Sequence, residues 1–268
     1  MTLIVSLRIP DGLVIAGDSL SSVQTKVGLI ADIQSECPLC KGKIDLKEIK
    51  MPPFPIPATT SSFAQKLFSF GRKFGIGSFG TGILNKKTIY YHVKELEAIA
   101  ADQENLNNLT LSNVKDLLLE HFDKEIKKEI LDIDRAPDNF YPLGFQVVGY
   151  EDGIGTTIEI NIGKKSRSQK ITGIGCTVSG DGQLVVQMWE LGKKDPRRGT
   201  NYERFSLQDA IDYAEFLITA TAKYQRFTNV IPSVGGEVDI ALVTPFGDFN
   251  WIRQKELARL LENFQKRG

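Results

Sequence analysis

The sequence lacks features that several classes of protein require. Among its 268 residues only three are Cys, two are His and two are Trp. It contains no apolar run of about 18 residues that could form a membrane-spanning helix. The N-terminus also has no basic region followed by a hydrophobic stretch, which a secretory signal would need. Lys and Arg together number 33, as do Asp and Glu, so the formal net charge is zero. We therefore expect no nucleic-acid partner, no membrane partner and, by default, a cytoplasmic location.

The rest of the composition is that of an ordinary globular protein. Hydrophobic residues make up 41% and charged residues 25% of the chain, and a chain of this length can bury a large core in one domain. The glycine-rich run at 75–82 is not followed by the Lys-Ser/Thr of a phosphate-binding loop. Any dependence on ATP would therefore have to come from a partner.

The most informative residue is Thr2, directly behind the initiator Met1. Removal of Met1 is easy when the next residue is small, and Thr2 would then carry both a hydroxyl and a free α-amine. These groups form a nucleophile and its own general base on one residue. Many proteins have Thr at this position by chance, so the residues around it decide the interpretation.

Thr2 opens a predicted β-hairpin. Residues 3–8 and 13–16 are rich in β-branched and apolar side chains, and Pro10-Asp11-Gly12 supplies turn residues between them. Folding the second strand back brings Asp18 near the chain start, where a buried carboxylate could be the partner of a cation. The alternative is that Gly17-Asp18-Ser19 is an ordinary loop after a strand.

The stretch from Thr2 to Ser19 resembles the start of a mature proteasome β subunit. Its Val14-Ile-Ala-Gly-Asp18 segment is also similar to the peptidase subunit of the bacterial two-component ATP-dependent protease. Both are N-terminal nucleophile (Ntn) hydrolases. The segments 178–183 and 234–243 resemble two later blocks of the family. The resemblance implies an α+β fold, a four-layer αββα sandwich, over the single domain 1–268.

The resemblance also implies roles for further residues. Lys66-Leu67-Phe68 matches the segment with the catalytic lysine, and Gly80 matches the glycine whose backbone N–H stabilises the oxyanion. Asp18 would keep Lys66 charged, because an unpaired buried ammonium would lose its proton. The alternatives are a solvated Lys66 and a tightly packed glycine-rich strand.

Two supporting residues depart from the family pattern. Asp181 stands where the family often has a serine that holds the N-terminal amine. In the later loop, Ile231 and Val234 occupy the positions of the family's Asp and Ser. Asp181 could take over the contact with the amine, and Ser233 could be shifted into reach by Pro232. These departures leave a reduced or altered activity open.

Periodicity predicts alternating strands and helices along the chain. Ser206 begins a helix-start box, and a helical segment follows Arg253. Predicted helices lie at about 89–100, 112–131, 183–191 and 206–218, and predicted strands at 75–82, 145–150, 156–162, 170–178, 238–243 and 249–252. This order fits the implied sandwich, although periodicity alone indicates only a mixture of α and β.

An inserted segment at about 23–63 separates Asp18 from Lys66. It contains Cys37-Pro-Leu-Cys40 and then the proline-rich run 51–57, which we expect to be extended and poor in sheet potential. Cys37 and Cys40 resemble half of a structural zinc site, which a second subunit would have to complete because such a site needs four ligands. The alternative is a thiol pair without metal. We expect His92 and His121 to be structural or surface groups.

Two classes of function agree with the sequence. The resemblance implies a threonine-type amidohydrolase, a peptidase that acts through an acyl-enzyme on Thr2 and needs no cofactor. Its expected partners are a peptide or protein substrate, other copies of the chain in a homo-oligomeric ring, and an ATPase unfoldase. A variant of the same chemistry would pass the acyl group to an amine and act as a ligase. The alternative class is a non-catalytic assembly or binding protein.

Overall fold

A computed structural model describes residues 2–27, 54–103, 106–229, 231–246 and 248–255. The chain divides into two compact units, residues 22–60 and the remainder of the chain. The larger unit contains Thr2 and every other predicted catalytic residue. No helix among the described residues is long and apolar enough to cross a membrane.

The first sheet of the larger unit contains the N-terminal hairpin. Its five strands run in the order β12 (Gly175–Gly180), β1 (Leu3–Ile9), β2 (Gly12–Asp18), β13 (Val238–Val243) and β14 (Phe249–Arg253). All neighbours are antiparallel. Every residue of β1 and β2 is buried, which explains their nearly continuous apolar sequence. The predicted hairpin is confirmed, and it places Asp18, at the end of β2, beside the start of β1.

The second sheet also has five antiparallel strands. Their order is β11 (Arg167–Thr172), β10 (Ile154–Ile162), β9 (Leu143–Glu151), β6 (Phe74–Gly80) and β5 (Leu67–Phe70). A two-stranded sheet of β7 (Ile83–Leu84) and β8 (Lys87–Thr88) follows β6. Lys66 lies directly before β5, so the second sheet supplies this predicted residue.

The described residues of the same unit form four α-helices: α1 (Ile89–Gln103), α2 (Leu111–Glu129), α3 (Gln183–Lys194) and α4 (Leu207–Arg226). Capping boxes begin α2 at Thr110 and α4 at Ser206, where each side chain accepts the backbone N–H three residues on. The box predicted at Ser206 is confirmed. Short 3₁₀ helices lie at Leu106–Asn108, Ile133–Arg135, Pro196–Arg198 and Tyr202–Arg204.

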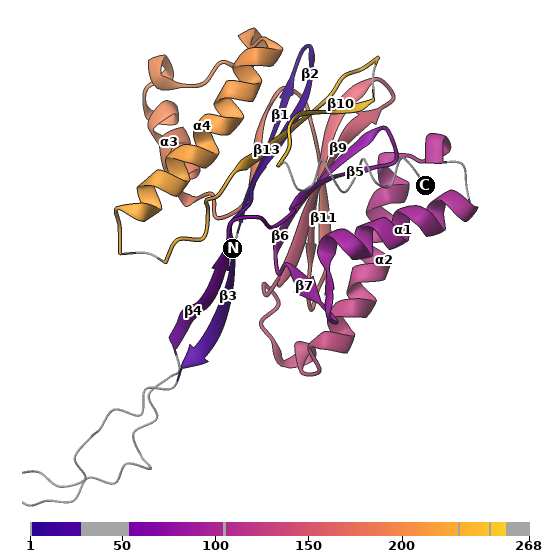
Figure 1. Ribbon diagram of the computed structural model, residues 1–268. Coiled ribbons are helices and arrows are strands. Elements are labelled where there is room, and N and C mark those ends of the chain that lie inside the picture. Colours follow the sequence, from indigo (N-terminus) through magenta and orange to yellow (C-terminus); the bar gives the residue numbers. More distant parts are fainter. Residues whose placement is uncertain (1, 28–53, 104–105, 230, 247, 256–268) are drawn as a thin grey trace, which may run out of the picture. The chain divides into compact units, whose positions relative to one another are not determined.

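Three apolar clusters show that these elements form four layers. One cluster joins α1 and α2 to the second sheet, and another joins α3 and α4 to the first sheet. The third lies between the sheets and includes Ile4 and Val148. A Cβ on Gly77 would come within 2.6 Å of Ile4, so glycine permits this close approach of the sheets. The predicted αββα sandwich is therefore confirmed (Figure 1).

The single strand predicted over residues 170–178 is wrong. Residues 167–172 form β11 in the second sheet, and residues 175–180 form β12 in the first sheet. Gly173 between them has a φ of 82°, a conformation that residues with a side chain rarely adopt. The turn at this glycine lets the chain cross from one sheet to the other.

The smaller unit contains a two-stranded sheet of β3 (Ser21–Val27) and β4 (Phe54–Ser61). The low sheet potential expected for residues 51–57 is wrong for the part in β4. In a two-stranded sheet each strand pairs on one side only. A proline can therefore occupy a position whose N–H would face the unpaired side, where no hydrogen bond is lost. Residues 28–53 lie outside the described residues.

Candidate functional site

The backbone around Thr2 is held by the first sheet. Thr2 is buried, and its carbonyl oxygen accepts a hydrogen bond from the Asp181 backbone N–H, at 2.8 Å. Leu3 lies opposite Gly180 in the pairing of β1 with β12. A Cβ on Gly180 would lie 1.8 Å from the Thr2 oxygen, and its φ is 87°. Glycine is thus required beside the predicted nucleophile.

Asp18 ends β2 and gathers four donors around a buried carboxylate. Its Oδ1 accepts the Leu3 backbone N–H and the Lys66 ammonium, each at 3.0 Å. Its Oδ2 accepts the backbone N–H groups of Leu20 at 3.2 Å and Gly235 at 3.0 Å. Burial raises the pKa of Asp18, while the Lys66 charge and the backbone donors oppose that rise. The carboxylate therefore joins β1, β2, Lys66 and the loop before β13.

Lys66 lies beside the backbone of Thr2 and Leu3, because Leu3 N and Lys66 Nζ share one acceptor atom. The ammonium also donates to the Leu20 carbonyl oxygen at 2.5 Å. The side chain is 8% exposed, and burial lowers the pKa of Lys66 below its usual range, against the opposing effect of Asp18. The structure thus brings Lys66, Asp18 and the backbone of Thr2 together where β1 begins and β2 ends.

Asp181 and Ser233 belong to a network with a residue that sequence analysis missed. Ser233 Oγ donates to Asp181 Oδ2 at 2.5 Å, and Gln225 Nε2 donates to the same oxygen at 2.9 Å. The Gln225 Oε1 accepts the backbone N–H groups of Ser233 at 2.9 Å and Val234 at 3.1 Å. Gln225 is buried near the end of α4. No sequence signal marks it, because a single polar residue near a helix end is common.

We expect Gln225→Leu to destabilise the protein. Each buried N–H group that loses its acceptor costs about 1–3 kcal/mol, and Ser233 and Val234 would each lose one. Thermal unfolding measures the change, with Gln208→Leu on the exposed face of the same helix as the control. A Gln225→Leu protein as stable as the Gln208→Leu protein would contradict this account of the network.

Gly80 ends β6 close to the start of β1. A Cβ on Gly180, next to Thr2, would lie 3.5 Å from the Cβ of Phe79. Gly80 itself has a φ of 98°, and a Cβ there would lie 2.3 Å from the Pro142 carbonyl oxygen. The structure therefore brings Gly80 close to the start of β1, where Thr2 lies. The backbone conformation and the nearby Pro142 oxygen also require glycine at position 80, whether or not its N–H binds an oxyanion.

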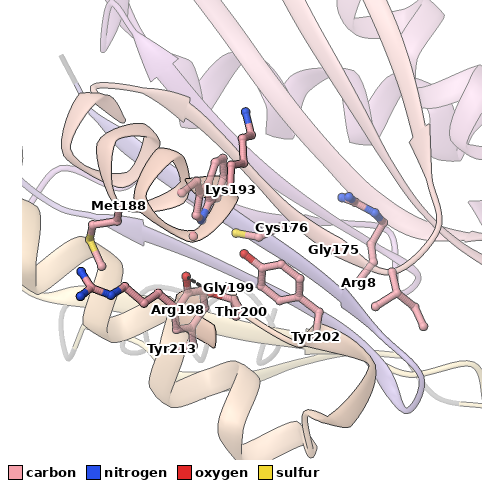
Figure 2. A pocket seen from close by; sticks show the side chains of 13 residues that line it. Arg8, Gly175, Cys176, Met188, Lys193, Arg198, Gly199, Thr200, Tyr202 and Tyr213 are labelled. Atoms are coloured by element: carbon pink, nitrogen blue, oxygen red, sulfur yellow. Dashed lines mark hydrogen bonds between the residues drawn. The ribbon is translucent and has the colours of Figure 1, made fainter. Parts of the chain in front are cut away.

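A hollow lies at the opposite end of these strands. In the pairing of β1 with β12, Leu3 lies opposite Gly180, whereas Arg8 lies opposite Gly175. The hollow has a volume of about 590 Å³ and is lined by α3, the following turns and residues such as Arg8, Cys176 and Tyr202 (Figure 2). Burial raises the pKa of the Cys176 thiol to about 12, so this cysteine is protonated at neutral pH and is a poor nucleophile.

Arg8 has a structural role at that hollow. Its Nε donates to the Gly173 carbonyl oxygen at 2.8 Å, and its Nη1 donates to the hydroxyls of Thr157 and Thr177 at 2.9 and 2.8 Å. These bonds hold the turn that joins the two sheets. A smaller hollow of about 430 Å³ is lined by residues that include Gly180 and Gly182, on the side of Thr2.

The proposed zinc ligands Cys37 and Cys40 lie outside the described residues. Within the described ranges, no group of three or more His, Cys, Asp or Glu side chains is placed to hold a metal ion. The two histidines contact each other: His92 Nδ1 lies 3.0 Å from His121 Nε2, and the other nitrogen of His92 lies 3.0 Å from the Leu84 carbonyl oxygen. They belong to the α1–α2 layer, which agrees with a structural role.

Comparison with known proteins gives a likeness of fold. No family model matches the sequence, and no curated protein matches it. Among solved structures, the chain is similar to a mutant of Anbu from Hyphomicrobium sp. strain MC1, which has a proteasome-like Ntn fold. The TM-score is 0.53 at 15% sequence identity, with 100% of this chain and 94% of that chain covered.

This result corrects the sequence-based assignment to the proteasome β-subunit-like family. The motifs indicated membership, but no family model matches them, and 15% identity carries the likeness no further than the fold. Short blocks such as Val14–Asp18 are apolar strand sequences with a terminal carboxylate, which unrelated strands also contain. The likeness therefore extends to the fold and not to the chemistry of this chain.

Proposed function

We propose that this protein is a threonine-type N-terminal nucleophile amidohydrolase that cleaves peptide bonds through an acyl-enzyme on Thr2. The observation that carries the proposal is the shared oxygen of Asp18, which accepts both the Leu3 N–H and the Lys66 ammonium. It sets a buried cation beside the residue that becomes the N-terminus once Met1 is removed. A hydroxyl, an α-amine and a neighbouring ammonium are the groups that this reaction requires.

In the proposed reaction, the Thr2 Oγ attacks the substrate carbonyl carbon while its proton passes to the Thr2 α-amine. The positive charge of Lys66 favours the developing alkoxide. The carbon–nitrogen bond then breaks, and the leaving amine takes the proton from the α-ammonium. Water attacks the resulting ester, which frees the acid and restores the Thr2 hydroxyl. Gly80 would supply an N–H to the tetrahedral oxyanion.

Asp181 and Ser233 support this proposal in a different way from the one predicted. The described contact of Asp181 with Thr2 is made by its backbone N–H, while its carboxylate is engaged by Ser233 and Gln225. We infer that the two residues hold the start of β1 in place and that Gln225 holds them. Acyl transfer to an amine, ring assembly and an ATPase partner stay predictions from the sequence.

The second candidate is a non-catalytic assembly protein, which the departures at Ile231 and Val234 favour. The state of the N-terminus separates the two functions, because a retained Met1 leaves Thr2 without a free α-amine. We expect the intact mass of the purified protein to lack Met1, and we expect hydrolysis of at least one substrate in a panel of fluorogenic peptides. Full retention of Met1 without any hydrolysis would favour the assembly protein.

A further inference from the structure

A second buried lysine–carboxylate pair lies in the larger unit, and the proposed chemistry does not use it. Lys255 is 4% exposed and Asp239 is 2% exposed. The Lys255 ammonium contacts Asp239 Oδ2, and the backbone N–H of Lys255 donates to Asp239 Oδ1 at 3.0 Å. Burying two charges costs free energy that only close pairing and further hydrogen bonds offset. Such a pair therefore calls for an explanation.

The pair reaches the segment that carries Lys66. The Lys255 ammonium donates to the Ala64 carbonyl oxygen at 2.8 Å. The Ala64 backbone N–H donates to the Ser19 carbonyl oxygen at 2.9 Å. Ala64 lies two residues before Lys66, and Ser19 follows Asp18. Both backbone groups of Ala64 are thus hydrogen-bonded: its carbonyl oxygen to Lys255, and its N–H to the residue that follows Asp18.

The two ion pairs also interact through their charges. Asp239 directly follows Val238, which lies opposite Asp18 in the pairing of β2 with β13. Among the described residues, the charged groups that act on the pKa of Lys66 are Asp18 and, with the same sign as Lys66, Lys255. The positive charge of Lys255 lowers the pKa of Lys66, in the same direction as burial and against the effect of Asp18.

We propose that the Asp239–Lys255 pair is a positioning pair, which fixes the backbone that carries Lys66 and thereby the place of the Lys66 ammonium beside Asp18. Asp239 sits in β13, and Lys255 follows β14, so the pair links the first sheet to the segment that enters the second. The inference rests on the proposed function only for the effect on catalysis. The effect on Lys66 itself follows from the contacts and the charges.

The test uses Lys255→Gln, which removes the charge and shortens the side chain so that it no longer reaches Ala64. We expect the NMR titration of ¹³Cε-labelled Lys66 to move to higher pH, because the neighbouring positive charge is gone. The Lys66 signal is assigned by its loss in Lys66→Met. We expect acylation by a β-lactone probe to slow by up to about 100-fold through misplacement of Lys66.

Three further variants define the outcome. Lys255→Arg keeps the charge, so its Lys66 titration should stay close to that of the wild type. Arg253→Gln removes a half-exposed cation of β14, paired with Glu215, and should change neither readout. If Lys255→Gln fails to fold, Asp239→Asn combined with Lys255→Gln removes both charges, and acylation should still be slow because Ala64 loses its donor.

An unchanged Lys66 titration in Lys255→Gln, with only a lower melting temperature, would overturn the proposal and assign the pair a purely structural role. Wild-type acylation rates in the folded double variant would overturn it as well. The titration requires no turnover, so it separates this inference from the proposed function. A shifted titration in a protein that no probe acylates would support the pair and contradict the peptidase.

Discussion

Thr2→Ala will abolish covalent modification by β-lactone and epoxyketone probes while the protein still folds. The substitution removes the only atom proposed to attack, and it keeps a small residue after Met1, so removal of Met1 continues. Removal of a catalytic nucleophile lowers turnover by roughly 10⁴-fold or more in comparable enzymes. The backbone contacts of Thr2 with Asp181 do not depend on its side chain.

Thr2→Ser is the matched control for this substitution. It keeps a hydroxyl and an α-amine on the first residue, so probe labelling should persist in Thr2→Ser and be absent in Thr2→Ala. Intact mass after probe treatment measures the adduct, and circular dichroism checks the fold. Full labelling of Thr2→Ala would show that another residue is the nucleophile.

Lys66→Met will lower the rate of acylation by roughly 10²- to 10⁴-fold, the range in which proton-transfer and charge-stabilising groups contribute. It will also destabilise the protein, since removal of one partner from a buried ion pair costs about 3–5 kcal/mol. Asp18 keeps its bonds from the backbone N–H groups of Leu3, Leu20 and Gly235. We therefore expect the variant to fold with a lower melting temperature.

Lys94→Met serves as the control for Lys66→Met. Lys94 is half-buried, pairs with Glu97 at 2.6 Å and donates to the carbonyl oxygen of Ser69 in β5. Its removal should cost some stability and leave acylation unchanged. Equal acylation rates in the Lys66→Met and wild-type proteins would remove Lys66 from the proposed chemistry.

Local sequence patterns predicted the hairpin and the helix start, because both depend on interactions between residues that are close in the sequence. The hairpin of β1 and β2 follows from its apolar strands and the Asp-Gly turn, and α4 begins where its capping box lies. The break at Gly173 was missed because glycines in a strand pattern, here Gly173 and Gly175, are compatible with either a bulge or a turn. Only the pairing of strands decides between them.

The candidate site was predictable only in part. Asp18 and Lys66 are 48 residues apart, so their contact depends on the stacking of two sheets and not on any local pattern. The blocks that resembled a family brought them together in the prediction, although the family assignment itself was wrong. Gln225 and Lys255 were missed because a buried amide and a buried ammonium each look like ordinary surface residues in a sequence.

Tandem mass spectrometry of the wild-type protein after treatment with a β-lactone identifies the nucleophile at the level of a single residue. We expect one acyl group for each chain, on a peptide that begins at Thr2, with an ester at its Oγ. Peptides that contain the other threonines and Cys176 should be unmodified. A peptide that still begins with Met1 and carries no acyl group, or an adduct at another residue, would contradict the assignment of Thr2 as an N-terminal nucleophile.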